Sequence, residues 1–499
     1  MMFNHTEAVD YFSLPVLAPN AFSQKISERC AEGWRLIALF ALPVSSGTPE
    51  IISILSSRAA QKLDAFRCVP VSEYPSATPS CPQAHLFERE MFEAWGIRPT
   101  GHPWLKPVRF CPPSNDARGK RPGPAETDYF MAEGKEAHEV AVGPVHAGVI
   151  EPGHFRFQCH GEDVIHLEIQ LGFQHRGVER LLTSASPARF IRLVENIAGD
   201  TCIGHATAYC SLLERMHGLQ TTKRAAKLRR LALELERLAN HTRDLGAIGG
   251  DTGFLPTSAW NGRITGDFLN LTAELCGSRF GRNLVCPGGV RWDVDSNQTS
   301  LLIKRLRSAY RDARGAVDVM LASGSVLARL SGTGTVRHED AIALGLVGVA
   351  AKACGISMDA RVDWPHEEWD GQAIPIRTHV SGDVLARTLV RSEELDDSAA
   401  DAEESLRYLS STSGEEACRV ELPELLPPQK MAVSLVEGWR GEICHIGITS
   451  SEGKWLAYKI VDPSFHNWTG LAMALRGEQI SDFPLCNKSF NLSYCGHDL

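Results

Sequence analysis

Residues 214–248 contain the longest helical pattern in this sequence, and it restricts the possible folds more than any other feature. The segment ERMHGLQTTKRAAKLRRLALELERLANHTRDLGAI contains no Pro and is rich in Leu, Ala, Arg and Glu, which favour helices. Either Thr221 or Thr222 can cap the start of its second helix. Helical patterning covers about 186–246 and returns over 300–330. Residues at helical spacing are expected to form a buried stripe: Leu228, Leu231, Leu235, Leu238 and Thr242.

The chain has 499 residues. This is longer than the length that a single hydrophobic core usually supports, so two or more domains are expected. Its 43% hydrophobic and 22% charged residues are typical of a globular protein. The net charge of −9 argues against broad nucleic-acid binding, which needs a basic surface to meet phosphates. No nucleic acid is therefore expected among its partners.

Residues 1–110 are predicted to form a small α/β domain. Apolar, strand-like runs cover 34–44 and 50–55. They precede the amphipathic stretch HLFEREMFEAW, residues 85–95, which has the spacing of a helix. Gly96 follows it directly and is a plausible C-cap.

Residues 111–137 are rich in Pro, Gly, Ala and charge without periodicity, and we interpret them as a linker. The second domain is expected to span 138–499. Its acidic, Ser-rich stretch at about 392–428 is expected to be an exposed insertion. Strand patterning returns over 431–460. The predicted fold class is α+β, a small α/β domain joined to a mainly helical domain with peripheral strands.

The sequence shows no membrane-spanning segment and no signal peptide. Its longest strongly apolar runs, such as 36–44, are far below the roughly 20 residues that a span needs. The N-terminal residues MMFNHTEAVDYF lack a basic segment followed by an apolar one. A cytoplasmic location is therefore expected, with any membrane link made through partner subunits.

None of the 14 cysteines stands in a C-x-x-C pair. Metal and iron–sulfur sites usually take two ligands from one tight turn, because that spacing aims both sulfurs at one ion. The spacing therefore disfavours a cluster or metal held by cysteines of this chain, and we predict no metal ligands.

Two short segments carry histidines that could act in proton transfer. His146 and His154 lie in a Gly/Pro-rich loop, where reactive groups are often placed, although a loop histidine usually only makes a hydrogen bond. His175 and Glu179 are four residues apart, so a helix would place them on one face. A local salt bridge of Glu179 with a neighbouring arginine is an equally good interpretation.

Two further segments combine several reactive residue types. Asp200, Cys202 and His205 lie close together beside glycines, but no second ligand pair completes a metal site. Near the C-terminus, the segment VDPSFHN (461–467) again combines Asp, Ser and His.

Several motifs in order resemble subunits of one family of redox complexes. FEREMFEAWGI (87–97) with GHPWL (101–105) resembles the thirty-kilodalton (C) subunit of complex I. Other stretches resemble its forty-nine-kilodalton (D) subunit and the large subunit of membrane-bound nickel–iron hydrogenases: 172–182, 234–241, 249–253, 286–291 and 436–442. The fusion of both parts resembles the large subunit of formate hydrogenlyase and hydrogenase-4 type complexes. The second domain is then expected to have the hydrogenase large-subunit fold.

The same resemblance implies that nickel cannot be held in the usual way. The four thiolate positions of the hydrogenases fall at Ala198, Thr201, Ser464 and Asn467, with Cys202 adjacent but out of register. These side chains cannot replace thiolates that bridge a soft metal. A nickel–iron centre is therefore disfavoured. In complex I the equivalent cavity is a quinone pocket.

The resemblance also implies candidate site residues. The catalytic candidates are His146, His154, His175, Glu179, Asp200 and His205, and Glu179 corresponds to the proton-relay glutamate of the hydrogenases. The candidates for binding a cofactor are Asp251, Arg291, Asp462, Ser464 and His466. The tyrosine that complex I is thought to use falls near Asn196, so another donor such as His205, Asp200 or Tyr209 would be needed.

The implied partners are an iron–sulfur subunit that carries a 4Fe-4S cluster and, indirectly, antiporter-like membrane subunits. The expected function is electron transfer from that cluster to a quinone or similar acceptor, coupled to proton movement, at the inner face of the cytoplasmic membrane. Two alternatives stay open: a non-catalytic scaffold that couples the partners, and an active nickel–iron hydrogenase. No cofactor other than the quinone is assigned to this chain, and activity of the chain alone is left open.

Overall fold

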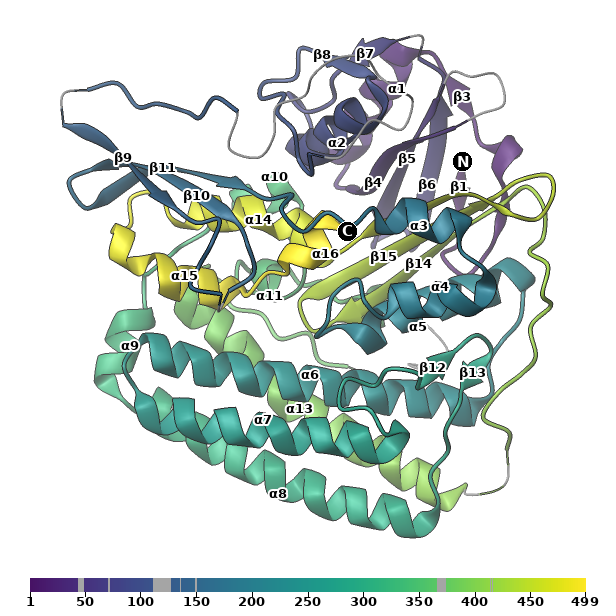
Figure 1. Ribbon diagram of the computed structural model, residues 1–499, viewed down its shortest axis with the longest axis vertical. Helices are drawn as coiled ribbons and strands as arrows, with labels where there is room; N and C mark the ends of the chain where they lie inside the picture. The colour runs from purple at the N-terminus through teal and green to yellow at the C-terminus, as the bar shows by residue number, and fades with distance from the viewer. Residues whose placement is uncertain are drawn as a thin grey trace.

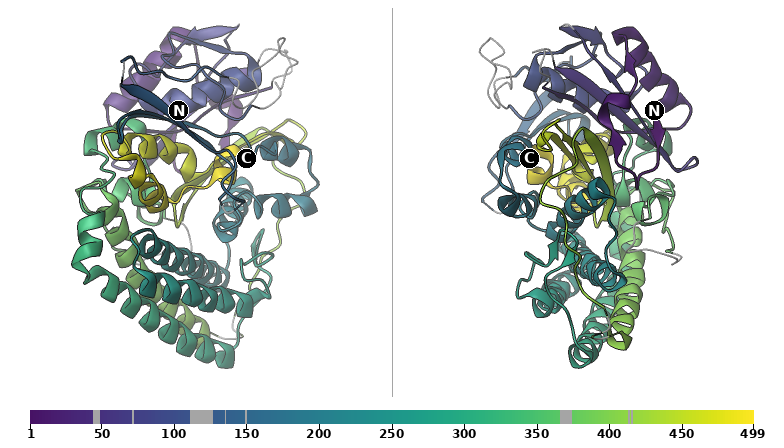
Figure 2. Two further views of the ribbon diagram at one scale, coloured as in Figure 1. Left: turned by 60° about the vertical axis from the view of Figure 1, so that its left-hand side comes forward. Right: turned by 90° about the vertical axis from the view of Figure 1, so that its right-hand side faces the viewer.

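The computed structural model describes residues 1–499 except 44–48, 71, 111–126, 135, 149, 366–373, 413 and 415. An N-terminal α/β domain lies at the top in Figure 1, a helical bundle lies at the bottom, and a second sheet lies between them. Both views of Figure 2 show the same order. The predicted α+β class is confirmed. Most of the predicted linker lies outside the described residues.

The N-terminal domain is a sheet of order β1-β6-β5-β4, with β3 parallel to β6, and two covering helices. The strands are β1 (Met2–Phe3), β3 (Val16–Leu17), β4 (Arg35–Leu42), β5 (Glu50–Ser57) and β6 (Lys62–Cys68), with a smaller parallel pair β7 (Glu73–Pro75) and β8 (Arg98–Thr100). The helices are α1 (Pro19–Ala31) and α2 (His85–Trp95). The predicted α2 is confirmed, and Gly96 is its left-handed C-cap with φ 71°.

The bundle contains the long helix that the sequence predicts. Its helices are α6 (Lys223–Asp251), α7 (Leu255–Cys276), α8 (Ser296–Leu321) and α13 (Val384–Ser411). Thr222 caps α6 by accepting a hydrogen bond from the amide of Ala225 at 3.1 Å. The predicted stripe from Leu228 to Thr242 is buried. Burial extends around the whole helix, because its buried arginines have carboxylate and carbonyl partners.

The prediction of an exposed insertion over 392–428 is wrong for residues 392–411, which belong to α13. Glu394, for example, is buried, and accepts a hydrogen bond from Lys352 at 2.8 Å. An acidic segment can pack inside a protein when its carboxylates meet cations there.

The sheet between the two ends has the order β16-β15-β14-β2. It consists of β2 (Val9–Asp10), β14 (Lys430–Gly438), β15 (Gly441–Thr449) and β16 (Trp455–Val461). The three C-terminal strands match the predicted patterning. Because β2 comes from the N-terminal domain, and side chains of β14 to β16 share that domain's hydrophobic core, the two domains pack as one body.

The remaining elements surround this sheet and the bundle. The strands are β9 (Ala137–Val142), β10 (His154–His160), β11 (Asp163–Gln170), β12 (Val285–Cys286) and β13 (Gly289–Val290). Helices α3 to α5 and α14 to α16 are α3 (Val178–Ser184), α4 (Pro187–Val194), α5 (Cys202–His217), α14 (Pro463–Ala474), α15 (Phe483–Phe490) and α16 (Tyr494–Asp498). The other helices are α9 (Gly324–Leu330), α10 (His338–Leu344), α11 (Gly348–Lys352) and α12 (Ala360–Asp363).

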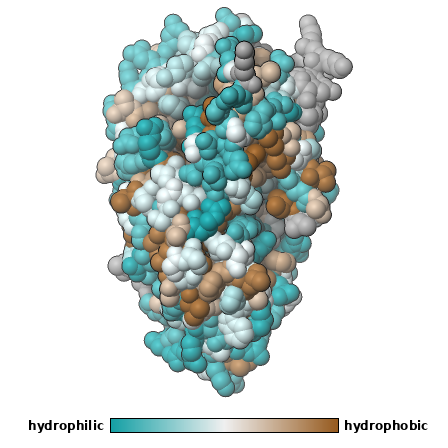
Figure 3. All heavy atoms as spheres, turned by 90° about the vertical axis from the view of Figure 1, so that its left-hand side faces the viewer, coloured by the Kyte–Doolittle hydropathy of each residue, from teal (hydrophilic) through white to brown (hydrophobic). Residues whose placement is uncertain are grey.

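None of the helices in the described part of the chain is both long and apolar enough to cross a bilayer. On the face drawn in Figure 3, apolar side chains are scattered among polar ones.

Candidate functional site

Four buried side chains form one continuous hydrogen-bonded chain where α5, α14, β15 and β16 meet. Nε2 of His205 lies 3.1 Å from Oδ2 of Asp462, and its Nδ1 lies 3.1 Å from Nε2 of His445. Nδ1 of His445 lies 2.8 Å from the hydroxyl of Tyr458. All four are buried. We call Asp462, His205, His445 and Tyr458 the buried relay, because adjoining imidazole and hydroxyl groups can pass a proton along such a chain.

Local structure fixes both ends of the relay. Asp462 is the N-cap of α14: its Oδ1 accepts a hydrogen bond from the amide of Ser464 at 2.8 Å, which leaves Oδ2 for His205. At the other end, β15 and β16 pair antiparallel with His445 opposite Ile460. Tyr458, two residues before Ile460, is therefore a diagonal neighbour of His445 on the same face.

Burial and neighbouring groups together set the protonation states of His445, Tyr458 and Asp462. Burial, with a smaller effect of His205, lowers the pKa of His445 well below its ordinary value. It raises the pKa of Tyr458 well above its usual range. For Asp462, burial alone would raise the pKa, but the His205 hydrogen bond and the charge of Arg440 lower it. The relay therefore joins an ionised carboxylate to a neutral phenol.

A bidentate ion pair lies beside the relay. Nη1 and Nη2 of Arg440 donate to Asp200 at 2.7 and 2.8 Å. The indole of Trp439 donates to the backbone carbonyl of Asp200 at 3.0 Å. Burial alone would raise the pKa of Asp200, but Arg440 outweighs it and the pKa is lowered. Asp200, two residues before the start of α5, is therefore kept ionised by Arg440.

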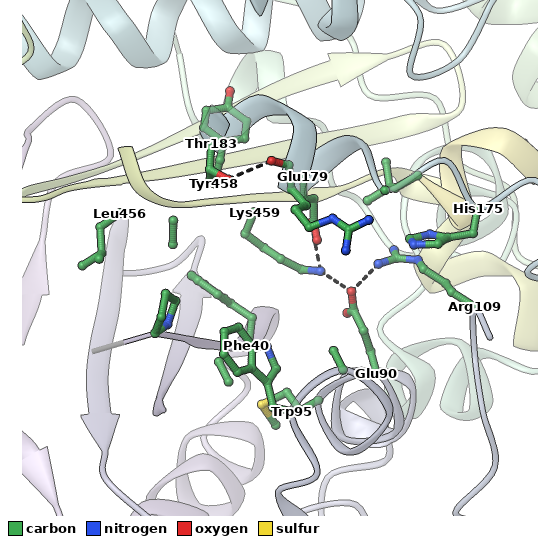
Figure 4. A pocket seen from close by; sticks show the side chains of 18 residues that line it. Phe40, Glu90, Trp95, Arg109, His175, Glu179, Thr183, Leu456, Tyr458 and Lys459 are labelled. Carbon is green, nitrogen blue, oxygen red and sulfur yellow. Dashed lines mark hydrogen bonds and ion pairs between the residues drawn. The ribbon is translucent and has the colours of Figure 1, made fainter. Parts of the chain in front are cut away.

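A cavity of 420 Å³ separates the N-terminal domain from β16 and α3 (Figure 4). Nζ of Lys459 donates to Glu90 at 2.6 Å and lies 3.1 Å from Glu179. Arg109 also pairs with Glu90. Glu179 accepts a hydrogen bond from the amide of Ile460 at 2.9 Å. The apolar part of the cavity wall is formed by Phe40, Met91, Trp95 and Leu456.

Tyr458 of the buried relay and its neighbour Lys459 both line the cavity. Consecutive strand residues point in opposite directions, so their polar groups have different partners. Lys459 reaches the carboxylates of the cavity, whereas the hydroxyl of its neighbour Tyr458 reaches His445. The amide that donates to Glu179 belongs to Ile460, which is two residues before Asp462 in the sequence. Groups able to exchange protons therefore flank both faces of one strand.

The structure brings together only some of the predicted site residues. His205 and Asp462 share the buried relay, whereas His175 and Glu179 line the cavity. The prediction that one helix aligns His175 with Glu179 is wrong, because α3 begins at Val178. The Nδ1 atom of His175 instead lies 2.7 Å from the carbonyl of Asp498.

The other predicted residues lie elsewhere or act locally. His146 and His154 each approach a carbonyl of their own loop, at 2.8 and 3.1 Å. Asp251, at the end of α6, and Arg291, after β13, are exposed and belong to neither the relay nor the cavity. Their functional roles stay predictions.

Ser464 and His466 are buried on α14. The hydroxyl of Ser464 accepts from the amide of Ser493 at 2.8 Å. Burial lowers the pKa of His466 to about 3, so its imidazole is neutral, and its ring lies against Phe87 of the N-terminal domain. Both residues therefore help to position α14.

Sequence reasoning missed His445, Tyr458, Lys459 and Glu90. His445 and Tyr458 lie on strands without a motif, and the His205–His445 contact joins residues 240 positions apart. Tyr209, named as a possible donor, stacks on Phe190 instead, with ring centroids 4.6 Å apart. The signal that could have found Glu90 is a charged residue on the buried face of an amphipathic helix.

Two of the four residues at the positions expected for thiolates, Thr201 and Asn467, form hydrogen bonds within the protein. The hydroxyl of Thr201 accepts from Trp439 at 3.2 Å, and the amide of Asn467 pairs with the backbone of Val347. Burial raises the pKa of the adjacent Cys202 to about 12, and its thiol donates to the carbonyl of Glu195. Within the described ranges, no three His, Cys, Asp or Glu side chains are grouped to hold a metal ion.

Comparisons with known proteins identify both parts of the chain. Residues 251–431 match the family model of the respiratory-chain NADH dehydrogenase 49 Kd subunit, and residues 48–129 match that of its 30 Kd subunit. Hydrogenase-4 component G of Escherichia coli strain K12 is 30% identical over 85% of this chain and 75% of its own length. The C/D subunit of NADH-quinone oxidoreductase from Bacteroides thetaiotaomicron is 25% identical over 82% of each chain.

A solved structure shares the fold. A chain of the membrane-bound sulfane sulfur reductase, an archaeal respiratory membrane complex, superposes with a TM-score of 0.67 at 23% identity, over 73% of this chain and 99% of its own. Motifs, fold and relatives agree. The chain therefore belongs to the family of oxidoreductase-complex large subunits shared by NADH dehydrogenase (complex I) and hydrogenase-type membrane complexes, with the 30 Kd and 49 Kd parts fused in one chain.

Proposed function

We propose that this subunit supports electron transfer from a 4Fe-4S cluster of a partner subunit to a quinone or similar small acceptor, and supplies protons to the reduced acceptor. The observation that carries this proposal is the buried relay. A two-electron acceptor of the quinone type needs protons as it is reduced, and Asp462, His205, His445 and Tyr458 form a continuous path for them.

Two further observations support a quinone rather than dihydrogen as the reactant. The histidine and carboxylate residues that are expected to transfer protons are present, but thiolates are missing at the four nickel positions. The relatives include a subunit named for quinone reduction. The redox centre would then belong to the partner, and this chain would supply binding, orientation and proton transfer.

The proposed location follows from the partners. The solved structure that shares the fold belongs to a respiratory membrane complex, so the chain would lie at the inner face of the cytoplasmic membrane, next to an iron–sulfur subunit. Antiporter-like membrane subunits would be reached indirectly, and proton movement through them would be coupled to the chemistry. The competing function is a non-catalytic scaffold. A scaffold would have the same fold but would not use the buried relay.

Tyr458→Phe tests the use of the relay with little change in packing. It removes the hydroxyl that lies 2.8 Å from His445. Quinone reduction by the purified complex is expected to fall about tenfold, which corresponds to the roughly 1.4 kcal/mol of one lost hydrogen bond. The assay is reductant-driven turnover of a water-soluble quinone analogue.

His146→Ala and His154→Ala are the matched comparisons, because both histidines were predicted from the sequence to supply protons. If quinone reduction falls in these two variants and not in Tyr458→Phe, the loop rather than the relay supplies protons. Unchanged turnover in all three variants would favour the scaffold.

A further inference from the structure

A second group of ionisable side chains is buried between α6, α11, α12, α13 and β14, outside the buried relay and the cavity. Its centre is Lys352, whose ammonium group is shared by three carboxylates. Nζ lies 2.6 Å from Asp359, 2.8 Å from Glu394 and 3.3 Å from Glu437. Each of these four residues is less than one-tenth exposed.

The group continues through two arginines and a histidine. Arg361 donates to Asp359 at 2.9 and 2.8 Å and to Glu234 at 3.2 Å. Arg237 lies 3.3 Å from Glu234 and 4.0 Å from Glu394. Nε2 of His241 lies 2.8 Å from Glu394. We call these eight residues the Lys352 cluster: Lys352, Asp359, Glu394, Glu437, Arg361, Glu234, Arg237 and His241.

The Lys352 cluster contains one more acid than it has fixed cations. Lys352, Arg361 and Arg237 face four carboxylates. Among the described residues, the charged groups packed around it are matched in pairs: Arg391 with Asp244, Arg230 with Asp401, Arg58 with Asp363, which accepts from the amide of Asp359, and Arg35 with Glu442, which lies opposite Glu437 on β15. With every carboxylate ionised, one negative charge would be left over in the interior, which is very costly without a counter-ion.

Glu437 is the carboxylate with the weakest support from cations. Its contact with Lys352 is the longest of the three, at 3.3 Å. Within the described part of the chain, the one donor to its other oxygen is neutral, the amide of Ala360 at 3.0 Å. Arg237 donates to the backbone carbonyl of Glu437 and not to its carboxylate. A proton is therefore best accommodated on this side chain.

His241 is a poorer place for the proton. Its Nδ1 is buried and has no hydrogen-bond partner. A protonated imidazole would therefore bury a charged N–H without an acceptor. Burial is also the main reason that the pKa of His241 is lowered, although Glu394 acts in the opposite direction.

We infer that the Lys352 cluster is a proton-binding site that takes up one exchangeable proton on the carboxyl group of Glu437. The site does not depend on the identity of the electron acceptor. Burial, followed by the charge of Asp359, raises the pKa of Glu437 to about 7. The proton would thus exchange near neutral pH.

The position of Glu437 gives this proton a route to influence the candidate site. Glu437 is followed on the same strand and turn by Trp439 and Arg440, which hold Asp200. On the other side of the cluster, the ring of His241 meets the ring of Trp439 edge to face, with centroids 6.3 Å apart. Binding or release of the proton by Glu437 therefore changes the charge near the Asp200–Arg440 ion pair.

Infrared difference spectroscopy of the whole complex, between about pH 5 and about pH 9, tests the assignment through the stretching band of protonated carboxyl groups. Wild type is expected to lose a band that shifts in D₂O, with a midpoint of about 7. Glu437→Gln, which imitates the protonated form, should lack this component. An unchanged band in Glu437→Gln would overturn the assignment.

Glu236→Gln is the matched control. Glu236 is another buried carboxyl group, and burial raises its pKa to about 8, but it is held by the amides of Ile203 and Gly204, outside the Lys352 cluster. The component with the midpoint of about 7 should persist in this variant. Its loss from Glu236→Gln with retention in Glu437→Gln would also overturn the assignment.

Thermal unfolding gives a second readout that needs no band assignment. A raised pKa in the folded state stabilises the protein below the ordinary glutamate pKa, and this contribution is lost as the pH rises through about 7. Glu437→Gln lacks this pH dependence. The difference in Tm, variant minus wild type, is therefore expected to become more positive as the pH increases from the ordinary glutamate pKa to about 7. Parallel curves of Tm against pH for the two proteins would contradict the inference.

Discussion

Lys352→Met is expected to lower the free energy of unfolding by about 3–5 kcal/mol, the usual cost of removing one partner from a buried ion pair. Methionine is unbranched like lysine and one atom shorter, but it leaves Asp359, Glu394 and Glu437 without the cation that they share. Burial alone would lower the pKa of Lys352, yet these carboxylates raise it, so the ammonium stays charged. Denaturant unfolding of the variant measures the loss.

Lys454→Met provides the matched control for this substitution. Lys454 also pairs with a glutamate, Glu452 at 2.8 Å, but both side chains are exposed. Exposed pairs are screened by water and salt, so this variant should unfold like the wild type. If Lys352→Met were no less stable than Lys454→Met, the three carboxylates would not depend on Lys352 for their charge.

His205→Leu is expected to reduce quinone turnover by on the order of 10²–10⁴-fold, the contribution of a positioned proton-transfer group. His205 is the central link of the buried relay, with Asp462 on one ring nitrogen and His445 on the other. Leucine fills much of the same space without a titratable nitrogen. Turnover of the purified complex with a quinone analogue measures this loss.

His217→Leu separates loss of the relay from damage to the helix. His217 is the last residue of α5, the helix that also carries His205, and it is only partly buried. This control should keep its turnover and assemble with its partners. Equal losses in both variants would assign the effect to α5 packing, and full turnover in His205→Leu would remove the relay from the reaction.

Sequence patterns predicted the elements that are defined by local interactions. Helix α2 and its Gly96 cap, the Thr222 cap of α6 and the three C-terminal strands each follow from spacing within a few residues. The family itself was visible because several short motifs occur in the right order.

Charges that meet partners far away in the chain could not be predicted in this way. Residues 392–411 have the composition of an exposed acidic segment, but Glu394 meets Lys352 and His241 in the core. Composition does not show whether the carboxylates of a segment will meet a buried cation. The same limit applied to the buried relay, because His445 and Tyr458 reach His205 only through strand pairing and helix packing.

The position of Asp462 in the fold is explained by local structure, because its motif is anchored by a cap. Asp462 precedes Pro463 at the start of α14, so its position follows from capping. His146 and His154 looked equally reactive in the sequence, but each bonds within its own loop. Residue type and loop setting alone do not show whether either histidine reaches a reactant, so their roles stay predictions.

The most direct test of the proposed function is reductant-driven reduction of a quinone analogue by the purified complex, with nickel determined in the same sample. We expect quinone turnover without stoichiometric nickel, because Ala198, Thr201, Ser464 and Asn467 stand where thiolates would be needed. Stoichiometric nickel together with hydrogen-dependent activity and no quinone turnover would contradict it.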